Sequence, residues 1–277
     1  MRTGGIIITG LICFLILTCA PLQAQQGGEP EEQPGQADGS NPLFRIIKDG
    51  KYGFIDQTGK VVIAPQFDSA SDFSEGLALV RIGGESTGKY GFIDKTGNYV
   101  SDPQFGDALS FSEGLAAVKT GGEWGYIDKT GMIAIDPQFS RTWGFSEGLA
   151  AAVYGNHWRY IDKSGQRVIK PKFDKAMSFS EGLASVKMGR LWGYTDKAGN
   201  YVIYPQFDEA GPFSNGLAAV RIFYPPEDMA AYLEEEIKAL LTDFDPVHWE
   251  ELTAYFDKNC KLGYIDKTGK YVWEPPN

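Results

Sequence analysis

From residue 43 onward, apolar and polar positions alternate in short runs that glycine and proline separate. Leu-Ala-Ala-Val-Lys at 115–119 has the alternation of a half-buried β-strand, and Glu-Trp-Gly-Tyr-Ile-Asp at 123–128 gives a second one. Asp-Lys-Thr-Gly at 128–131 fits a type I turn with glycine in the left-handed position, which joins two antiparallel strands. In another copy, Tyr-Val-Ile at 201–203 is a third strand, and Pro205 ends it because proline has no donor for the ladder. The pattern therefore predicts a three-stranded antiparallel unit.

This unit is repeated in tandem at a spacing of about 34 residues. An aromatic residue recurs in the second strand at Tyr52, Tyr90, Trp124, Trp158 and Trp192. We count six units across 42–277, the last one shortened. One such unit cannot bury its apolar face alone, so we expect an all-β array in which neighbouring units stack. Propeller blades usually hold four strands in ~40–45 residues. The shorter unit favours an open or spiral array, with a closed propeller-like ring as the alternative.

The N-terminus predicts export. Arg2 precedes a short apolar run, Ile6–Leu17, and a small residue, Ala24, offers a cleavage site. This is the pattern of a secretory signal peptide over 1–24, and the run is shorter than the ~20 residues that a membrane-spanning helix needs. A retained anchor and lipidation at Cys19 are the alternatives. Residues 25–41 carry four acidic residues and no aromatic or β-branched residue, which predicts a disordered acidic linker.

One unit is interrupted by about 36 residues, 224–259, which break the β pattern. Apolar residues at helical spacing predict one helix over 227–241, and Asp245-Pro246 predicts the start of a second that ends near Lys258. Together they predict a helical hairpin inserted in the last unit. The segment from Glu227 to Lys258 contains ten acidic residues and two lysines, a net charge of −8. Charge of this kind favours contact with a basic partner, or simply a solvated helix surface.

The repeated motifs resemble those of the bacterial WG repeat, also called the KWG repeat. Trp124-Gly125 and Trp192-Gly193 carry the eponymous pair, while Trp158-Arg159 departs from it. Asp-Lys-Thr-Gly, Pro-Gln-Phe and Phe-Ser-Glu-Gly-Leu recur beside the pair. The resemblance implies a β-rich repeat scaffold with no common catalytic residue, and it supports binding rather than chemistry.

The amino-acid composition argues against several classes of binding site and of catalytic site. The formal net charge of −10 argues against nucleic acid as a partner, since phosphate binding needs a basic surface. Two histidines and three cysteines in the whole chain argue against zinc sites and histidine-based nucleophiles, so we expect no metal or cofactor. Carboxylates that recur in every unit, such as Asp128 and Glu113, are better explained as turn residues than as the single asymmetric pair of a hydrolase. Apart from the N-terminal run, no stretch is apolar enough to span a bilayer.

Two sets of residues are candidates for binding. The first is the aromatic ladder Tyr52, Tyr90, Trp124, Trp158 and Trp192, which would suit stacking on sugars if exposed and inter-unit packing if not. The second lies on the acidic insert: Glu234, Glu235, Asp243, Trp249 and Glu250. We expect an exported, non-enzymatic scaffold that binds another protein at the cell envelope. A cell-wall or glycan-binding module that uses the ladder is the alternative.

Overall fold

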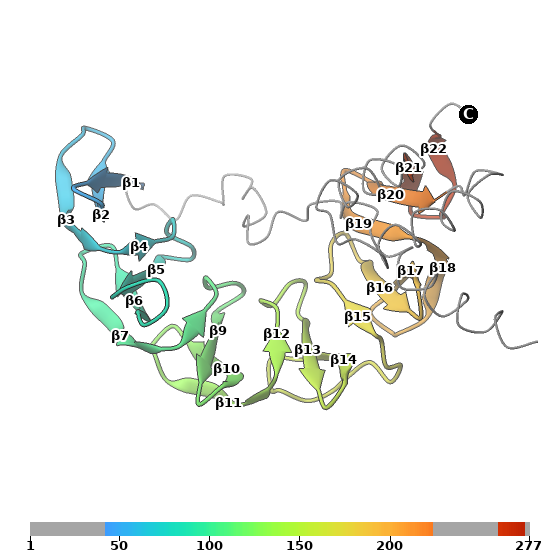
Figure 1. Ribbon diagram of the computed structural model, residues 1–277, viewed down its shortest axis with the longest axis horizontal. Helices are drawn as coiled ribbons and strands as arrows, with labels where there is room; N and C mark the ends of the chain where they lie inside the picture. Colours follow the sequence, from blue (N-terminus) through green and yellow to red (C-terminus); the bar gives the residue numbers. More distant parts are fainter. Residues whose placement is uncertain (1–41, 224–259, 275–277) are drawn as a thin grey trace, which may run out of the picture. The chain divides into compact units, whose positions relative to one another are not determined.

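The computed structural model describes residues 42–223 and 260–274 (Figure 1). The predicted signal peptide, the linker and the helical insertion at 224–259 lie outside these residues. Within them the protein consists of β-strands and turns, with no α-helix. The described residues form two compact units. The N-terminal unit contains 42–189 and 195–201, and the C-terminal unit contains 190–194, 202–223 and 260–274.

The N-terminal unit is a series of antiparallel sheets that follow one another in chain order (Figure 1). Its first sheet has the order β1-β2-β3, with β1 (Leu43–Lys48), β2 (Lys51–Asp56) and β3 (Val61–Phe67). The next has the order β4-β5-β6-β7, with β4 (Ser69–Ala70), β5 (Leu77–Ile82), β6 (Lys89–Asp94) and β7 (Tyr99–Phe105). The third sheet contains β8 (Asp107–Ala108), β9 (Leu115–Thr120), β10 (Glu123–Asp128) and β11 (Ile133–Phe139). The fourth contains β12 (Arg141–Thr142), β13 (Ala150–Tyr154) and β14 (His157–Ile161), and β15 (Lys175–Ala176) then pairs with β16 (Ala184–Met188).

The C-terminal unit repeats the same pattern. The hairpin of β17 (Leu191–Thr195) and β18 (Tyr201–Phe207) is followed by a four-stranded sheet. That sheet has the order β19-β20-β21-β22 and consists of β19 (Glu209–Ser214), β20 (Leu217–Phe223), β21 (Cys260–Asp266) and β22 (Tyr271–Trp273). The strands β20 and β21 pair directly from Leu217 and Asp266 to Phe223 and Cys260, so the 224–259 segment connects the ends of one hairpin.

The all-β tandem architecture is therefore confirmed, but the three-stranded unit is too small. After the Pro-x-Phe motif the chain makes a further strand of two residues, which pairs with the first long strand of the next sheet. Ala70 lies opposite Val80 in this way, and Ala108 lies opposite Val118. Two residues show no measurable alternation, so the hydrophobic pattern could not reveal this strand. Each of the first three repeats thus contributes three long strands to one sheet and a two-residue strand to the next.

The glycine of the Trp-Gly pair allows a tight approach between the second and third strands. The third strand bulges opposite this glycine, so that Tyr126 pairs with Ile135 but Trp124 pairs with Phe139. A Cβ on Gly125 would lie 2.5 Å from the Ile135 carbonyl oxygen and 2.7 Å from the Pro137 nitrogen. Glycine at 53, 91 and 193 shows the same approach, each to a carbonyl oxygen at 2.5–2.6 Å. Only a residue without a side chain fits there.

The fourth repeat shows what happens without this glycine. Arg159 stands at the corresponding position, and a residue with a Cβ cannot accept the close backbone approach that the glycines allow in the other repeats. The segment from Arg167 to Phe173 contacts β14 through the isolated bridges Ile161–Arg167 and Trp158–Phe173 instead of a continuous third strand. The departure from the Trp-Gly pair therefore has a direct structural consequence.

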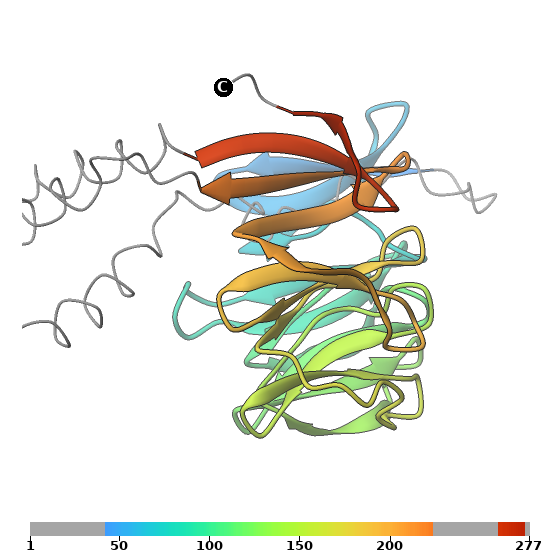
Figure 2. The same ribbon diagram turned by 90° about the vertical axis from the view of Figure 1, so that its right-hand side faces the viewer.

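The core of the N-terminal unit lies between successive sheets. Phe54 and Phe67 of the first sheet pack with Ala78, Val80 and Ile93 of the second. The corresponding residues join the second sheet to the third, the third to the fourth, and the fourth to β15 and β16. The phenylalanine of each Phe-Ser-Glu motif packs on the preceding sheet, as when the Phe73 and Phe54 ring centroids lie 4.8 Å apart. Figure 2 shows neighbouring sheets of this unit as successive layers.

We expect Gly125→Ala to lower the free energy of unfolding by about 1–3 kcal/mol, the usual cost of overpacking, because the new Cβ would overlap backbone atoms that cannot move independently. Thermal and urea unfolding measure this. Gly144→Ala is the matched control, since its Cβ would meet nothing closer than 3.8 Å. Equal stability of the two variants would contradict the role assigned to the glycine.

Contact between repeats can be tested at the turn glycines. Gly165 and Gly59 have nearly the same positive φ, 80° and 83°, but a Cβ on Gly165 would lie 2.9 Å from the Ile135 side chain of the preceding repeat, whereas one on Gly59 would meet nothing within 4 Å. Both alanine variants carry the same backbone strain. We therefore expect Gly165→Ala to reduce the thermal midpoint more than Gly59→Ala, and an equal reduction would argue against the stacking contact.

Candidate functional site

The recurring aspartates hold the turn that follows the second strand. Asp128 Oδ1 accepts hydrogen bonds from the Thr130 backbone N–H at 2.9 Å, the Thr130 hydroxyl at 2.6 Å and the Met132 N–H at 3.2 Å. The bond from the Thr130 hydroxyl, with the two backbone bonds, holds the pKa of Asp128 below its ordinary value. Asp56, Asp94, Asp162 and Asp266 make the equivalent contacts. The interpretation of these aspartates as turn residues is confirmed.

The Ser-Glu-Gly motifs form a second kind of turn. Ser74 and Leu77 exchange backbone hydrogen bonds of 2.8 and 3.0 Å, and the two residues between them both have positive φ, 51° at Glu75 and 90° at Gly76. This is the geometry of a type I′ hairpin turn, whose first central position favours Asn, Asp or Gly. Glutamate at that position is uncommon. Its recurrence at Glu75, Glu113, Glu147 and Glu181 therefore calls for another explanation than the turn alone.

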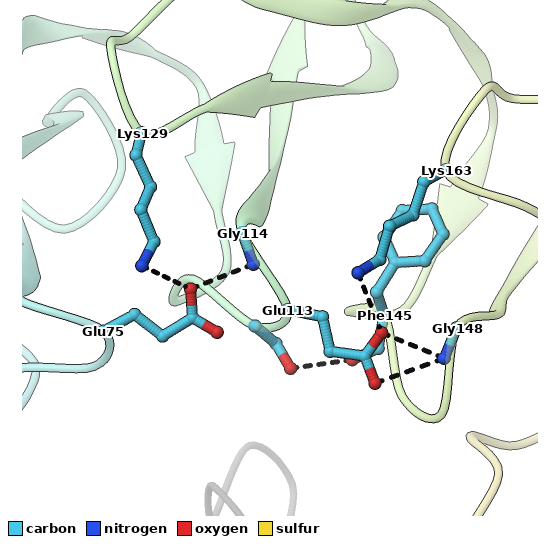
Figure 3. Close-up of polar contacts among 8 residues, drawn as sticks. Glu75, Glu113, Gly114, Lys129, Phe145, Gly148 and Lys163 are labelled. Atoms are coloured by element: carbon cyan, nitrogen blue, oxygen red, sulfur yellow. Dashed lines mark hydrogen bonds and ion pairs between the residues drawn. The ribbon is translucent and has the colours of Figure 1, made fainter.

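The explanation is a series of bonds between repeats, shown in Figure 3. The Glu75 carboxylate accepts the Gly114 N–H at 2.9 Å and lies 2.9 Å from Lys129 Nζ. One repeat later, Glu113 accepts the Gly148 N–H at 2.9 Å and lies 3.3 Å from Lys163 Nζ. We call this row the Ser-Glu-Gly seam, and it comprises 74–76, 112–114, 146–148 and 180–182.

The serines of the seam add a parallel set of bonds. The hydroxyls of Ser74, Ser112 and Ser146 each donate at 2.7 Å to a backbone carbonyl of the next repeat, those of Phe111, Phe145 and Phe179. Exposed ion pairs contribute about 0.2–1 kcal/mol each, whereas burying one phenylalanine side chain contributes about 1.5–3 kcal/mol. Apolar stacking thus supplies most of the stability, and the seam fixes how one repeat sits on the next.

The seam also lowers the pKa values of Glu75 and Glu147. Partial burial of Glu75 raises its pKa. The Lys129 ammonium and the Gly114 N–H together lower the pKa by more than burial raises it, so the net pKa lies below the ordinary 4.5. Glu147 shows the same net lowering, with Lys197 and Gly182 as its partners. Sequence reasoning placed these glutamates in turns and missed the bond to the next repeat. The available signal was a glutamate at a position that a type I′ turn reserves for asparagine or glycine.

The predicted aromatic ladder packs largely between repeats. Trp124 is buried in the cluster that joins the third and fourth sheets, and Lys119 Nζ lies 5.9 Å from its ring centroid. Tyr52, Tyr90 and Trp158 are half-buried against the neighbouring clusters. Trp192 is half-buried in the C-terminal unit. Whether these rings bind a ligand stays a prediction, as does the role of Glu234, Glu235, Asp243, Trp249 and Glu250, which lie outside the described residues.

Trp158 belongs to a pair of stacked tryptophans. Its ring centroid lies 6.0 Å from that of Trp143, with 14° between the planes. Trp143 remains 38% exposed, and its indole N–H donates to the Ala176 carbonyl at 3.1 Å. Arg167 Cζ lies 4.9 Å from the Tyr154 ring centroid in the same repeat. The fourth repeat thus presents aromatic and basic groups where it departs from the common pattern.

A row of exposed apolar residues runs along the outer edge of the first three sheets. Val61, Tyr99 and Ile133 begin β3, β7 and β11, and each lies opposite the isoleucine of the second strand. They are 50%, 41% and 48% exposed, and we call them the edge row. They place one exposed apolar side chain at the same register of the edge strand in each of these three sheets.

Residues 42–223 and 260–274 contain neither a cluster of metal ligands nor a membrane-spanning helix. No three His, Cys, Asp or Glu residues of these ranges come together in a group that would hold a metal ion. No helix of these residues has the length and apolar character to cross a bilayer.

The sequence comparison agrees with the repeats seen in the structure. The family profile described as "WG containing repeat" matches five segments, 52–85, 90–124, 124–158, 158–192 and 192–222. These cover more than half of the chain, and each runs from one ladder aromatic towards the next. The sixth unit counted from the sequence has no such match. No curated protein matches the chain.

One solved structure resembles the fold at low sequence identity, and others align with lower scores. A eukaryotic initiation factor structure aligns with a TM-score of 0.50 and 11% identity over 84% of this chain, and the chain spans 62% of that structure's length. A protein of unknown function from Bacteroides caccae aligns over 86% of this chain and 94% of its own, with 15% identity and a TM-score of 0.32. The extracellular domain of a putative one-component system from B. thetaiotaomicron gives 12% identity and a TM-score of 0.38, over 64% of this chain and 30% of its own.

The seam predicts a pH dependence of stability. Because the pKa of Glu75 is lower in the folded chain than its ordinary 4.5, its ionised form stabilises the fold above that pH, and the contribution is lost as the pH falls through the folded pKa. We expect Glu75→Gln to unfold more easily than the parent at neutral pH, by up to about 1 kcal/mol, and the difference to shrink below pH 4.5. Urea unfolding at several pH values measures it. The exposed Glu85→Gln serves as control and should show no such convergence.

Proposed function

Because this chain belongs to the family of WG-containing repeats, we propose that it is an exported, non-catalytic scaffold that binds another protein at the bacterial cell envelope. The repeat architecture supports the scaffold role, since stacked sheets present a long surface built from similar elements. The recurring carboxylates support a non-catalytic role. They are engaged in turns and in the bonds between repeats, where the pKa values of Asp128 and Glu75 are lowered rather than raised.

The single observation that carries the proposal is the edge row. Val61, Tyr99 and Ile133 keep 41–50% of their surface exposed at one register of successive sheets. Their chain neighbours Val62 and Met132 are also exposed apolar residues, at 40% and 69%. Exposed apolar residues that line up in this way are typical of protein-interaction surfaces.

The geometry of these edge strands favours recognition through side chains. Each of β3, β7 and β11 has two register shifts, one beside its first residues and one around its proline. Bulges interrupt the row of backbone donors and acceptors that an added strand would need. The partner therefore contacts the apolar side chains instead of extending the sheet.

Export is proposed from the residues at the N-terminus. The apolar run and Ala24 have the pattern of a signal peptide, and the acidic linker at 25–41 would separate the repeats from the membrane. The acidic insert at 224–259 is a second proposed contact, for a basic region of the same partner.

A second function, glycan binding, is favoured by the stacked pair of Trp143 and Trp158. A partly exposed indole that is held flat by a second ring suits stacking on a sugar. This candidate differs from the first in its residues, so one set of variants distinguishes them.

The test is capture of envelope proteins and of purified cell wall by the full chain without residues 1–24. The captured protein is identified, purified and titrated directly. We expect the triple variant Val61→Ser, Tyr99→Ser, Ile133→Ser to bind it at least ~10-fold more weakly, the factor that corresponds to about 1.4 kcal/mol. Deleting 224–259 should weaken the same complex.

Ile82→Ser is the matched control, because Ile82 is an exposed apolar residue at the end of β5, outside the edge row. It should leave the affinity unchanged. Unaltered binding by the triple variant would contradict the proposal. Loss of cell-wall binding by Trp143→Ala, with the triple variant unaffected, would establish the glycan function instead.

A further inference from the structure

Every joint between sheets of the N-terminal unit has two different faces. The sheet nearer the N-terminus contributes a donating face with large side chains, such as Phe54, Ile63 and Phe67. The following sheet contributes a receiving face with smaller ones, Ala78, Val80 and Ile93, all 0% exposed. The next joint pairs Phe92 and Phe105 with Ala116, Val118 and Ile127. The joints are therefore directional, since the two faces are not interchangeable.

The receiving face of the first sheet is uncovered within the N-terminal unit. The pairing of β1 with β2 places Phe44, Ile46 and Ile55 at the positions of Ala78, Val80 and Ile93 in the next sheet. Phe44 is 50% exposed, and Ile46 and Ile55 are half-buried. Ile47, where the next sheet has Arg81, is 62% exposed.

The turn glycine of the first sheet gives an independent indication. In later repeats of this unit, a Cβ on the turn glycine would meet the preceding repeat, as at Gly97 with Ile63 at 3.3 Å and Gly165 with Ile135 at 2.9 Å. A Cβ on Gly59 would meet nothing within 4 Å. The first sheet thus has the shape of a receiving face with its neighbour missing.

The last sheet has the opposite face uncovered within the C-terminal unit. Tyr264 occupies the position of Phe92 and Tyr126, which are 0% exposed, yet Tyr264 is 40% exposed. Trp273 occupies the position of Ile135, and its exposure is 50% instead of 3%. These two rings lie edge to face, with centroids 6.2 Å apart. They form a donating face without an occupant among the described residues of this unit.

We propose that the chain associates head to tail, with the last sheet of one copy seated on the first sheet of a second copy. The register of the interior joints predicts that Tyr264 and Trp273 of one copy meet Phe44 and Ile46 of the other. Phe44 and Trp273 are larger than their interior counterparts, which gives this joint the aromatic character of an interface between chains. A joint between unlike faces generates rings or open chains of subunits rather than a closed two-fold dimer.

Directionality makes the proposal testable by complementation. Phe44→Asp places a charge on the receiving face alone, and Trp273→Asp places a charge on the donating face alone. We expect the parent to associate as its concentration rises in sedimentation equilibrium, and each variant alone to stay monomeric. An equimolar mixture of the two variants should form a one-to-one dimer, because each supplies the face that the other lacks.

Milder variants guard against misfolding. Ile47→Arg introduces the residue type that β5 carries at the same position, and Trp273→Ile introduces the interior residue type. Each removes apolar surface from an uncovered face, so each should weaken association at least ~10-fold, equivalent to about 1.4 kcal/mol, with unchanged circular dichroism. The proposal would be overturned by a parent that stays monomeric at every concentration, as when a chain closes on itself. It would also be overturned by a Phe44→Asp or Trp273→Asp variant that still self-associates. Failure of the mixture of these two variants to dimerise would overturn it as well.

Discussion

Burial of one sheet against the next is the interaction on which the rest of the structure depends. A sheet of three or four short strands has two apolar faces and almost no interior of its own, so it gains stability only by stacking. The phenylalanine or tyrosine at the centre of each second strand does most of this, since Phe54, Phe92 and Tyr126 are 0% exposed. Tyr126 adds a hydrogen bond of 2.7 Å from its hydroxyl to the Trp143 carbonyl of the next repeat, and burial raises the pKa of that phenol. Polar groups thus reinforce a contact that the aromatic ring already makes.

The stacking imposes the shape of the repeat. A third strand that bulges around proline turns its phenylalanine towards the next sheet, and this bulge requires glycine directly opposite. The two residues of the Trp-Gly pair therefore act together in stacking the repeats. The aromatic residue packs between repeats, and the glycine lets the backbone of the third strand approach to 2.5 Å of where a Cβ would lie. The seam then fixes how each repeat sits on the next, since Glu75 bonds both to Gly114 of the following turn and to Lys129.

Sequence reasoning reached the features that are local. The strands of the repeat and the turn role of Asp128 follow from alternation and from turn chemistry, and the family profile matches five of the repeats. The features that it missed are those that join one repeat to another. A two-residue strand such as Ser69–Ala70 has no periodicity to detect, although it pairs with Arg81 and Val80 and so joins the first repeat to the sheet of the second. Likewise, Glu75 and Lys129 are 54 residues apart, so nothing along the chain indicates that they meet.

Variation among the repeats has a physical meaning in such an array. Because each repeat contacts only its neighbours, a local departure has a local cost, and the rest of the array stays intact. Arg159 illustrates this, since it replaces the tight bulge of its own repeat with two isolated bridges, while Tyr160 and Phe173 remain buried between the sheets. The same repeat gains the stacked pair of Trp143 and Trp158 and the contact of Arg167 with Tyr154. Stability therefore depends on the positions where the repeats agree. Specific recognition can develop where they differ, because a change there alters the surface without weakening the joints.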